Sequence, residues 1–182
     1  LHEPYRRQRQ MCIRDRVNGR PLELNRLELI SDAILEIWQP GVNGALPMAG
    51  ILSGRINPSG KLAMTFPYST GQIPIYYNRR KSGRGHQGFY KDITSDPLYP
   101  FGHGLSYTEF KYGTVTPSVT KVKRGDRLSV EVTVTNVGAR DGAETVHWFI
   151  SDPYCSITRP VKELKHFEKQ LIRAGETKTF RF

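Results

Sequence analysis

The chain has 182 residues and a formal net charge of +10, and 37% of its residues are hydrophobic. This length and composition are typical of one or two globular domains with a real core. The two cysteines, Cys12 and Cys155, are too few for a disulfide framework or a zinc-binding pattern. No apolar run reaches the roughly 18 residues of a membrane-spanning helix, so the sequence predicts no membrane partner.

The first sixteen residues carry five arginines against two acidic residues and show no apolar period. Residues 11–16 (MCIRDR) resemble the translated end of a sequencing-library adaptor. We therefore expect residues 1–16 to be a non-native leader and leave them out of the fold. The alternative is a natural, disordered basic tail.

Residues 17–110 are predicted to form the C-terminal part of an α/β domain. One amphipathic helix, ended by Pro40-Gly41, is indicated by apolar residues at helical spacing: Leu27, Ile30, Ile34 and Ile37. Residues 47–52 predict a second, shorter helix, and residues 57–60 a turn. A short strand is expected at 61–66. Residues 67–110 are loop-like, and their dense aromatic residues indicate a functional or closely packed loop.

From Tyr112 onward the hydrophobic pattern has a period of two, which predicts antiparallel strands with one buried face. The first strand covers 128–134, and the next has an inward stripe of Val146, Trp148 and Ile150. Two more are expected at 164–171 and 177–182, around a turn at Gly175. Residues 111–182 therefore predict an immunoglobulin- or fibronectin III-like sandwich. Its 71 residues from Tyr112, against roughly 100 for a complete sandwich, indicate truncation at the C-terminus.

The motifs argue against a cofactor. Residues 83–88 satisfy G-x-G-x-x-G, but no strand precedes them and no helix follows, so a nucleotide site is not expected. The histidines lack metal-ligand spacing, so no metal is expected either. Asp92 and Asp96 share a loop, but no feature of the sequence marks them as the carboxylate pair of a glycosidase. No catalytic residue is assigned.

Basic and aromatic residues gather in the loop, among them Arg79, Arg80, Tyr76 and Tyr77. Packing explains this composition best. Sugar contact comes second, through aromatic stacking and donation to hydroxyls. Single-stranded nucleic acid comes last, and it is not predicted as a partner.

Several segments resemble the C-terminal part of glycoside hydrolase family 3, of the bacterial β-glucosidase type, and they occur in the family's order. In the first domain they are 17–22 (VNGRPL), 33–41 (AILEIWQPG), 57–62 (NPSGKL) with 65–67 (TFP), 72–78 (QIPIYYN) and 98–108 (LYPFGHGLSYT). Residues 159–164 (RPVKEL) and 175–177 (GET) resemble the family's fibronectin type III-like module. Residues 42–47 (VNGALP) depart from the glycine-rich, acidic loop of many members.

The resemblance implies a parent protein that hydrolyses O-glycosidic bonds with retention, as a β-glucosidase-like enzyme of carbohydrate catabolism. The family's aspartate nucleophile and glutamate acid/base would both precede Val17, so this chain alone is expected to be inactive. A periplasmic or secreted location is implied by the family, although no signal segment is visible.

The long polar loop suggests which residues contact the carbohydrate substrate in the intact enzyme. We expect Arg84, His86 and Gln87 to line the rim of the cleft. The alternative reading of the whole chain is a stand-alone carbohydrate- or partner-binding module without catalysis.

Overall fold

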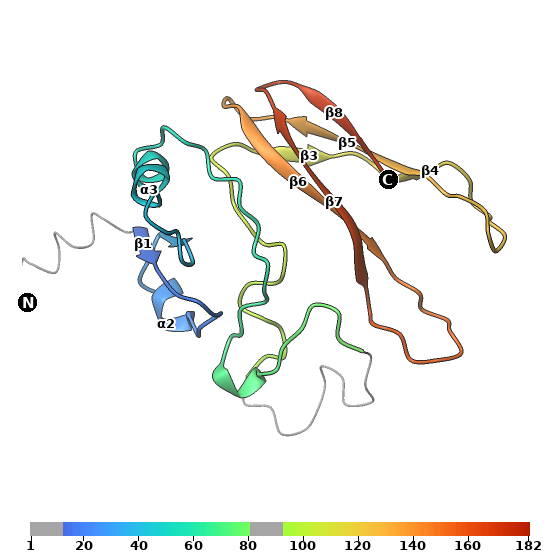
Figure 1. The fold of residues 1–182 in the computed structure, drawn as a ribbon, viewed down its shortest axis with the longest axis horizontal. Coiled ribbons are helices and arrows are strands. Elements are labelled where there is room, and N and C mark those ends of the chain that lie inside the picture. Colours follow the sequence, from blue (N-terminus) through green and yellow to red (C-terminus); the bar gives the residue numbers. More distant parts are fainter. Residues whose placement is uncertain (1–12, 81–92) are drawn as a thin grey trace, which may run out of the picture. The chain divides into compact units, whose positions relative to one another are not determined.

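The computed structural model describes residues 13–80 and 93–182 (Figure 1). The chain divides into two compact units. One, here the α/β unit, comprises Leu1–Ile56 and Leu62–His103, and the other, here the sandwich unit, comprises Asn57–Lys61 and Gly104–Phe182. The chain therefore crosses from one unit to the other three times.

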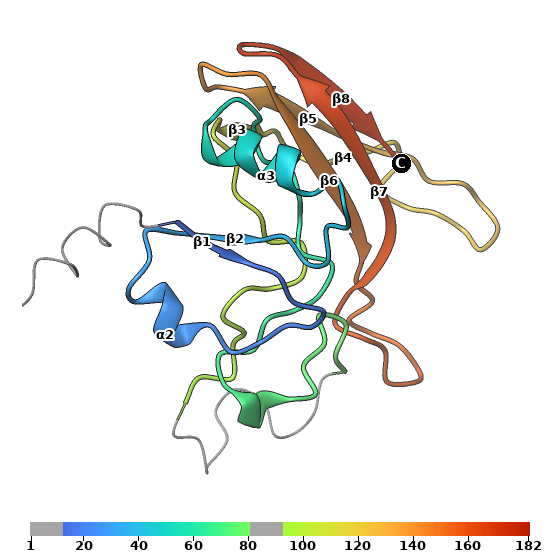
Figure 2. The same cartoon turned by 60° about the vertical axis from the view of Figure 1, so that its left-hand side comes forward.

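The α/β unit contains a small parallel sheet and short helices. Strand β1 (Ile13–Arg16) pairs in parallel with β2 (Ala33–Glu36), and the two lie side by side in Figure 2. Helix α2 covers Asn25–Glu28 and α3 covers Ala45–Leu52, and a 3-10 turn covers Thr70–Gln72. None of the helices in the described ranges is long and apolar enough to cross a membrane.

The predicted amphipathic helix with Leu27, Ile30, Ile34 and Ile37 is wrong. Only α2 is helical there, and the following apolar run forms β2. A short apolar run such as Ala33–Leu35 fits either a strand or part of a helix, and periodicity alone does not separate the two. The partner of β2 is β1, whose four residues belong to the segment that the sequence analysis left out of the fold.

The second helix is confirmed as α3, which begins two residues before the predicted start and is followed by Gly54 with φ +73°. The predicted strand at 61–66 is wrong. This segment runs beside 98–103 with scattered hydrogen bonds, such as Phe66 N–H to Tyr99 O at 2.8 Å, and forms one isolated bridge. The backbone hydrogen bonds of this segment to residues 98–103 occur at Leu62 and Phe66, and no bonded pair lies between these two residues. The segment therefore does not form a regular β-strand.

The sandwich unit confirms the predicted all-β architecture. In its first sheet the central strand β5 (Val130–Asn136) pairs with β8 (Thr177–Arg181) and with two short strands, β3 (Phe110–Tyr112) and β4 (Thr116–Pro117). Strands β6 (Gly142–Ile150) and β7 (Glu163–Ile172) form the second sheet, a long hairpin in both views (Figures 1 and 2). The core between the sheets consists of Val132, Val134, Val146, Trp148, Ile172 and Phe180.

The predicted inward stripe of β6 is confirmed for two of its three residues. Val146 and Trp148 are buried, but Ile150 is 52% exposed. The register of β6 against β7 shifts between Trp148 and Phe149. A bulge of this kind interrupts the alternation of faces, and so Ile150 no longer continues the buried stripe.

Candidate functional site

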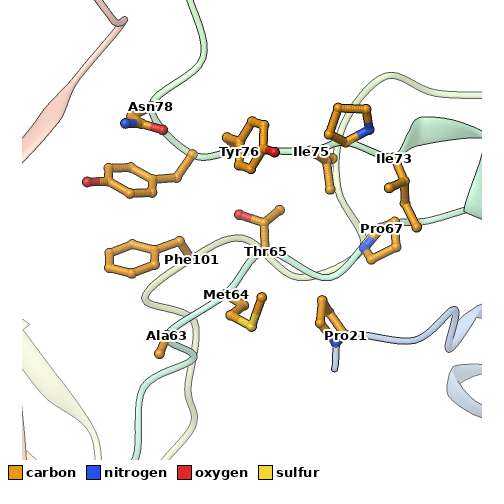
Figure 3. A pocket seen from close by; sticks show the side chains of 12 residues that line it. Pro21, Ala63, Met64, Thr65, Pro67, Ile73, Ile75, Tyr76, Asn78 and Phe101 are labelled. Carbon is orange, nitrogen blue, oxygen red and sulfur yellow. The ribbon is translucent and has the colours of Figure 1, made fainter. Parts of the chain in front are cut away.

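The α/β unit contains a pocket of about 330 Å³ formed by four parts of the chain (Figure 3). Two of its walls come from residues 63–67 and 73–78, and Pro21 and Phe101 complete it. Figure 3 shows Phe101 at one end and Pro21 with Pro67 at the other. All of these residues belong to one unit, so the pocket is a feature of that unit alone.

The segment leading into the pocket is fixed by side-chain hydrogen bonds around the 3-10 turn. Ser69 and Gln72 form a capping box, which satisfies backbone amides at the start of the turn. Gln72 Nε2 also donates to the carbonyl oxygens of Thr94 at 2.7 Å and Asp96 at 3.1 Å. One glutamine side chain therefore connects the turn to the returning chain.

A second anchor comes from Glu23. Its carboxylate accepts from the backbone N–H and the hydroxyl of Thr70, both at 2.9 Å. These two bonds hold the pKa of Glu23 below its ordinary value, because they favour the charged carboxylate. Residues 73–78 thus enter the pocket from a turn that is held on two sides.

The pocket surface is mainly apolar and aromatic. Tyr77 and Phe101 stack with ring centroids 4.4 Å apart, and the side chains of Ile73 and Tyr76 are more than half exposed. Asn78 is among the few polar residues that line it. An apolar wall with a few polar groups can bind an apolar group or the face of a sugar ring. Among the described residues that line the pocket there is no Asp or Glu.

The predicted site residues Arg84, His86 and Gln87 lie outside the described residues, as do Asp92 and the G-x-G-x-x-G segment. Asp96 is described, and its carbonyl accepts from Gln72 as part of the anchored turn. Tyr76 and Tyr77, singled out for their aromatic character, do line the pocket.

Sequence reasoning missed Ile73 and Phe101 as lining residues. The signal was present in the resemblance, since both lie in the family-like segments 72–78 and 98–108. The described ranges contain no group of three or more His, Cys, Asp and Glu that could hold a metal ion.

The deepest charged group of the described ranges lies in the sandwich unit. Glu144 is 5% exposed and is held by Lys61 and Tyr112. Burial, and then the hydrogen bond to Glu144, raises the pKa of Tyr112. A carboxylate held by a lysine and a phenol inside a sandwich is a structural arrangement. The fold is therefore an α/β unit followed by an all-β sandwich unit, the architecture that the resemblance to glycoside hydrolase family 3 implies.

Comparison with known proteins agrees with this class. Residues 10–107 match the "Glycosyl hydrolase family 3 C-terminal domain", and residues 144–182 match the "Fibronectin type III-like domain". The chain therefore belongs to glycosyl hydrolase family 3.

Curated relatives and a solved structure share most of the chain. The periplasmic beta-glucosidase of Salmonella typhimurium is 44% identical over 174 residues, which cover 91% of this chain and 23% of the relative. A beta-xylosidase of Formosa agariphila is 41% identical over 91% of this chain and 23% of its own length. The beta-glucosidase of Listeria innocua in complex with glucose has a TM-score of 0.85 and 44% identity, over 93% of this chain and 25% of that structure. This chain spans about a quarter of the length of these proteins.

Proposed function

We propose that this chain is the C-terminal part of a retaining β-glycosidase of the β-glucosidase type. The observation that carries the proposal is the 44% identity to a periplasmic beta-glucosidase across 91% of the chain. It is supported by a fold shared with a beta-glucosidase whose structure contains glucose. The substrate class is then a β-glucoside or a related oligosaccharide.

In the parent, an aspartate upstream attacks the anomeric carbon, and a glutamate upstream protonates the leaving oxygen and then activates water. This chain contributes neither group. Its share is the end of the α/β domain, with the aromatic pocket, and the sandwich that follows. The purified chain alone therefore does not hydrolyse an aryl β-glucoside.

The experiment is a chimera that replaces the matched C-terminal segment of the Salmonella enzyme with residues 13–182 of this chain. We expect the chimera to hydrolyse an aryl β-glucoside with retention, and the isolated chain to release no product. A folded, inactive chimera together with saturable glycan binding by the isolated chain would favour the stand-alone binding module instead. Product release by the isolated chain would contradict the proposed position of the catalytic pair.

Within the same proposal, Arg84, His86 and Gln87 contact sugar hydroxyls at the rim of the cleft. The support is their place in a segment whose sequence predicts a long polar loop. Replacing all three by alanine in the chimera should lower kcat/KM, whereas alanine at Arg124 and Arg127 in the sandwich unit should leave it unchanged. An unaltered kcat/KM in the triple variant would remove these residues from the site.

The proposed location is periplasmic or secreted. It is supported by the family resemblance and by the name of the Salmonella relative. Fractionation of the native host by osmotic shock, followed by an activity assay of each fraction, tests it. Activity confined to the cytoplasmic fraction would contradict the proposal.

A further inference from the structure

Five residues leave the α/β unit and pack within the sandwich unit. Residues 57–61 (NPSGK), here called the strap, belong to the sandwich unit, while Ile56 and Leu62 on either side belong to the α/β unit. Sequence reasoning interpreted residues 57–60 as an ordinary turn. The contacts of the strap show a much more specific arrangement.

Asn57 begins the strap and uses both ends of its side-chain amide. Its Oδ1 accepts from the Ser106 hydroxyl at 2.9 Å and from the Tyr107 backbone N–H at 2.8 Å. Its Nδ2 donates to the carbonyl oxygen of Asp141 at 3.0 Å. One side chain therefore holds two segments of the sandwich, 49 and 84 residues further along the chain.

Lys61 ends the strap with a partly buried ion pair. Its Nζ lies 3.1 Å from Glu144 Oε1, and it donates to the carbonyl oxygen of Gly104 at 3.0 Å. The Glu144 side chain is 6% exposed and also accepts from the Tyr112 hydroxyl at 2.7 Å. A buried carboxylate is costly without a cation, and Lys61 supplies that cation from the strap.

At two glycines of the sandwich unit, the strap lies too close to leave room for a side chain. A Cβ on Gly104 would lie 2.2 Å from the carbonyl oxygen of Gly60, which is backbone and cannot move away easily. A Cβ on Gly142 would lie 2.9 Å from Asn57 Nδ2, and still closer to Thr108. The sandwich thus fits residues 57–61 by shape, by hydrogen bonds and by charge.

The two connections at the strap's end are also bonded to each other. On the sandwich side Lys61 bonds the Gly104 carbonyl. Within the α/β unit the next residues continue the contact, with Leu62 N–H to His103 O at 2.7 Å and Gly102 N–H to Leu62 O at 2.8 Å. Residues 62–103 therefore begin and end at neighbouring stretches of chain that are hydrogen-bonded to each other, and Lys61 of the strap makes one of these bonds.

We propose that the strap is an intramolecular ligand of the sandwich, and that its binding makes the folding of the two units one cooperative event. The alternative is two modules on simple linkers, which unfold independently. In the described part of the α/β unit few apolar side chains are buried, chiefly Leu24 and Phe66, and a core this small supplies little stability of its own. The inference concerns folding and holds whether or not the parent is a glycosidase.

The chain provides one natural probe for each unit. It has two tryptophans, Trp38 in the α/β unit and Trp148 in the sandwich unit. The full chain labelled with 5-fluorotryptophan gives a separate ¹⁹F signal for each, without any substitution. In a urea titration we expect the two signals to report the same unfolding midpoint.

The variant combines Asn57→Ala with Lys61→Met, which removes the strap's polar contacts. We expect both midpoints to fall, because Glu144 loses its cation, and the Trp38 midpoint to fall further than that of Trp148, so that the two curves separate. The matched control is Lys165→Met, which breaks an ion pair with Glu163 in the same unit but away from the strap, and whose curves should stay coincident. Coincident curves in the double variant, or separate curves in the starting chain, would overturn the proposal.

A second measurement covers the case in which the double variant does not fold. Hydrogen exchange of the unaltered chain compares the amides of Leu62 and Phe66 with those of Val132 and Phe180 in β5 and β8. One cooperative event predicts protection factors for the two sets within about tenfold of each other. Protection of the α/β amides that is lower by several orders of magnitude would refute the coupling.

Discussion

Asn136, at the end of β5, is fully buried, and all of its side-chain hydrogen-bonding groups are used. Its Oδ1 accepts from the Thr108 hydroxyl at 2.6 Å and from the Gly138 N–H at 3.1 Å. Its Nδ2 donates to the carbonyl oxygens of Arg140 at 2.7 Å and Ile172 at 3.0 Å. The Asn136→Ala substitution should therefore be one of the most damaging single changes in the sandwich.

The magnitude follows from these four bonds. Each is worth about 0.5–1.5 kcal/mol net, so Asn136→Ala should lower the free energy of unfolding by about 4 kcal/mol. Thr108→Val removes one of the four and should cost about 1 kcal/mol. Asn136→Asp keeps the acceptor but turns a carboxylate oxygen toward two carbonyls, so it should cost at least as much as alanine.

Urea unfolding followed by the ¹⁹F signal of Trp148 in the chain labelled with 5-fluorotryptophan measures these losses, provided that the slope m stays unchanged. The control is Thr135→Val on the same strand, which removes an exposed hydrogen bond to Thr177 and should cost about 0.5 kcal/mol or less. The reasoning is refuted if Asn136→Ala costs less than about 1 kcal/mol at constant m.

Three further predictions concern charged groups. Lys61→Met should destabilise the chain by about 3 kcal/mol, because it leaves the buried Glu144 without its cation. The double variant Lys61→Met with Glu144→Leu should recover much of this loss. Equal losses of stability in the single and the double variant, measured by chemical denaturation, would contradict this prediction. Burial, and then the charge of Lys61, lowers the pKa of His147 below its ordinary 6.5, so the unfolded chain binds the proton more readily, and stability should decline as pH falls below 6.5. His147→Gln should flatten that part of the stability profile, and an unchanged slope would refute the assignment. The pKa of Glu23 is lowered by its bonds from Thr70, so its contribution is present above 4.5 and lost as pH falls through the folded value; Thr70→Ala should move the carboxyl titration, read by NMR, back up.

The strands of the sandwich were largely predictable, because each has one solvent-exposed and one buried face and so alternates polar and apolar residues. The alternation in residues 128–134 identified β5, and Gly175 with φ +77° marks the predicted turn before β8. The sequence analysis did not single out Asn136. Its partner Ile172 lies 36 residues away, and local sequence carries no record of such a pairing.

The α/β unit was harder to predict, since its elements depend on distant partners. Strand β2 needs β1, and the adaptor-like sequence of residues 11–16 removed β1 from consideration. The pocket depends on Phe101 stacking on Tyr77 across 24 sequence positions, which only the family resemblance could suggest. The ion pair between Lys61 and Glu144 could not be predicted either. The sequence analysis placed Lys61 in the α/β domain and Glu144 in the sandwich, 83 residues further along the chain.

The most direct test of the central claim is to sequence the gene upstream of the codon for Ile13. The account predicts one continuous reading frame that encodes a domain with the aspartate nucleophile, followed by the first part of the α/β domain with its glutamate. A frame that opens with the sixteen N-terminal residues of this chain, and encodes no upstream domain, would contradict it.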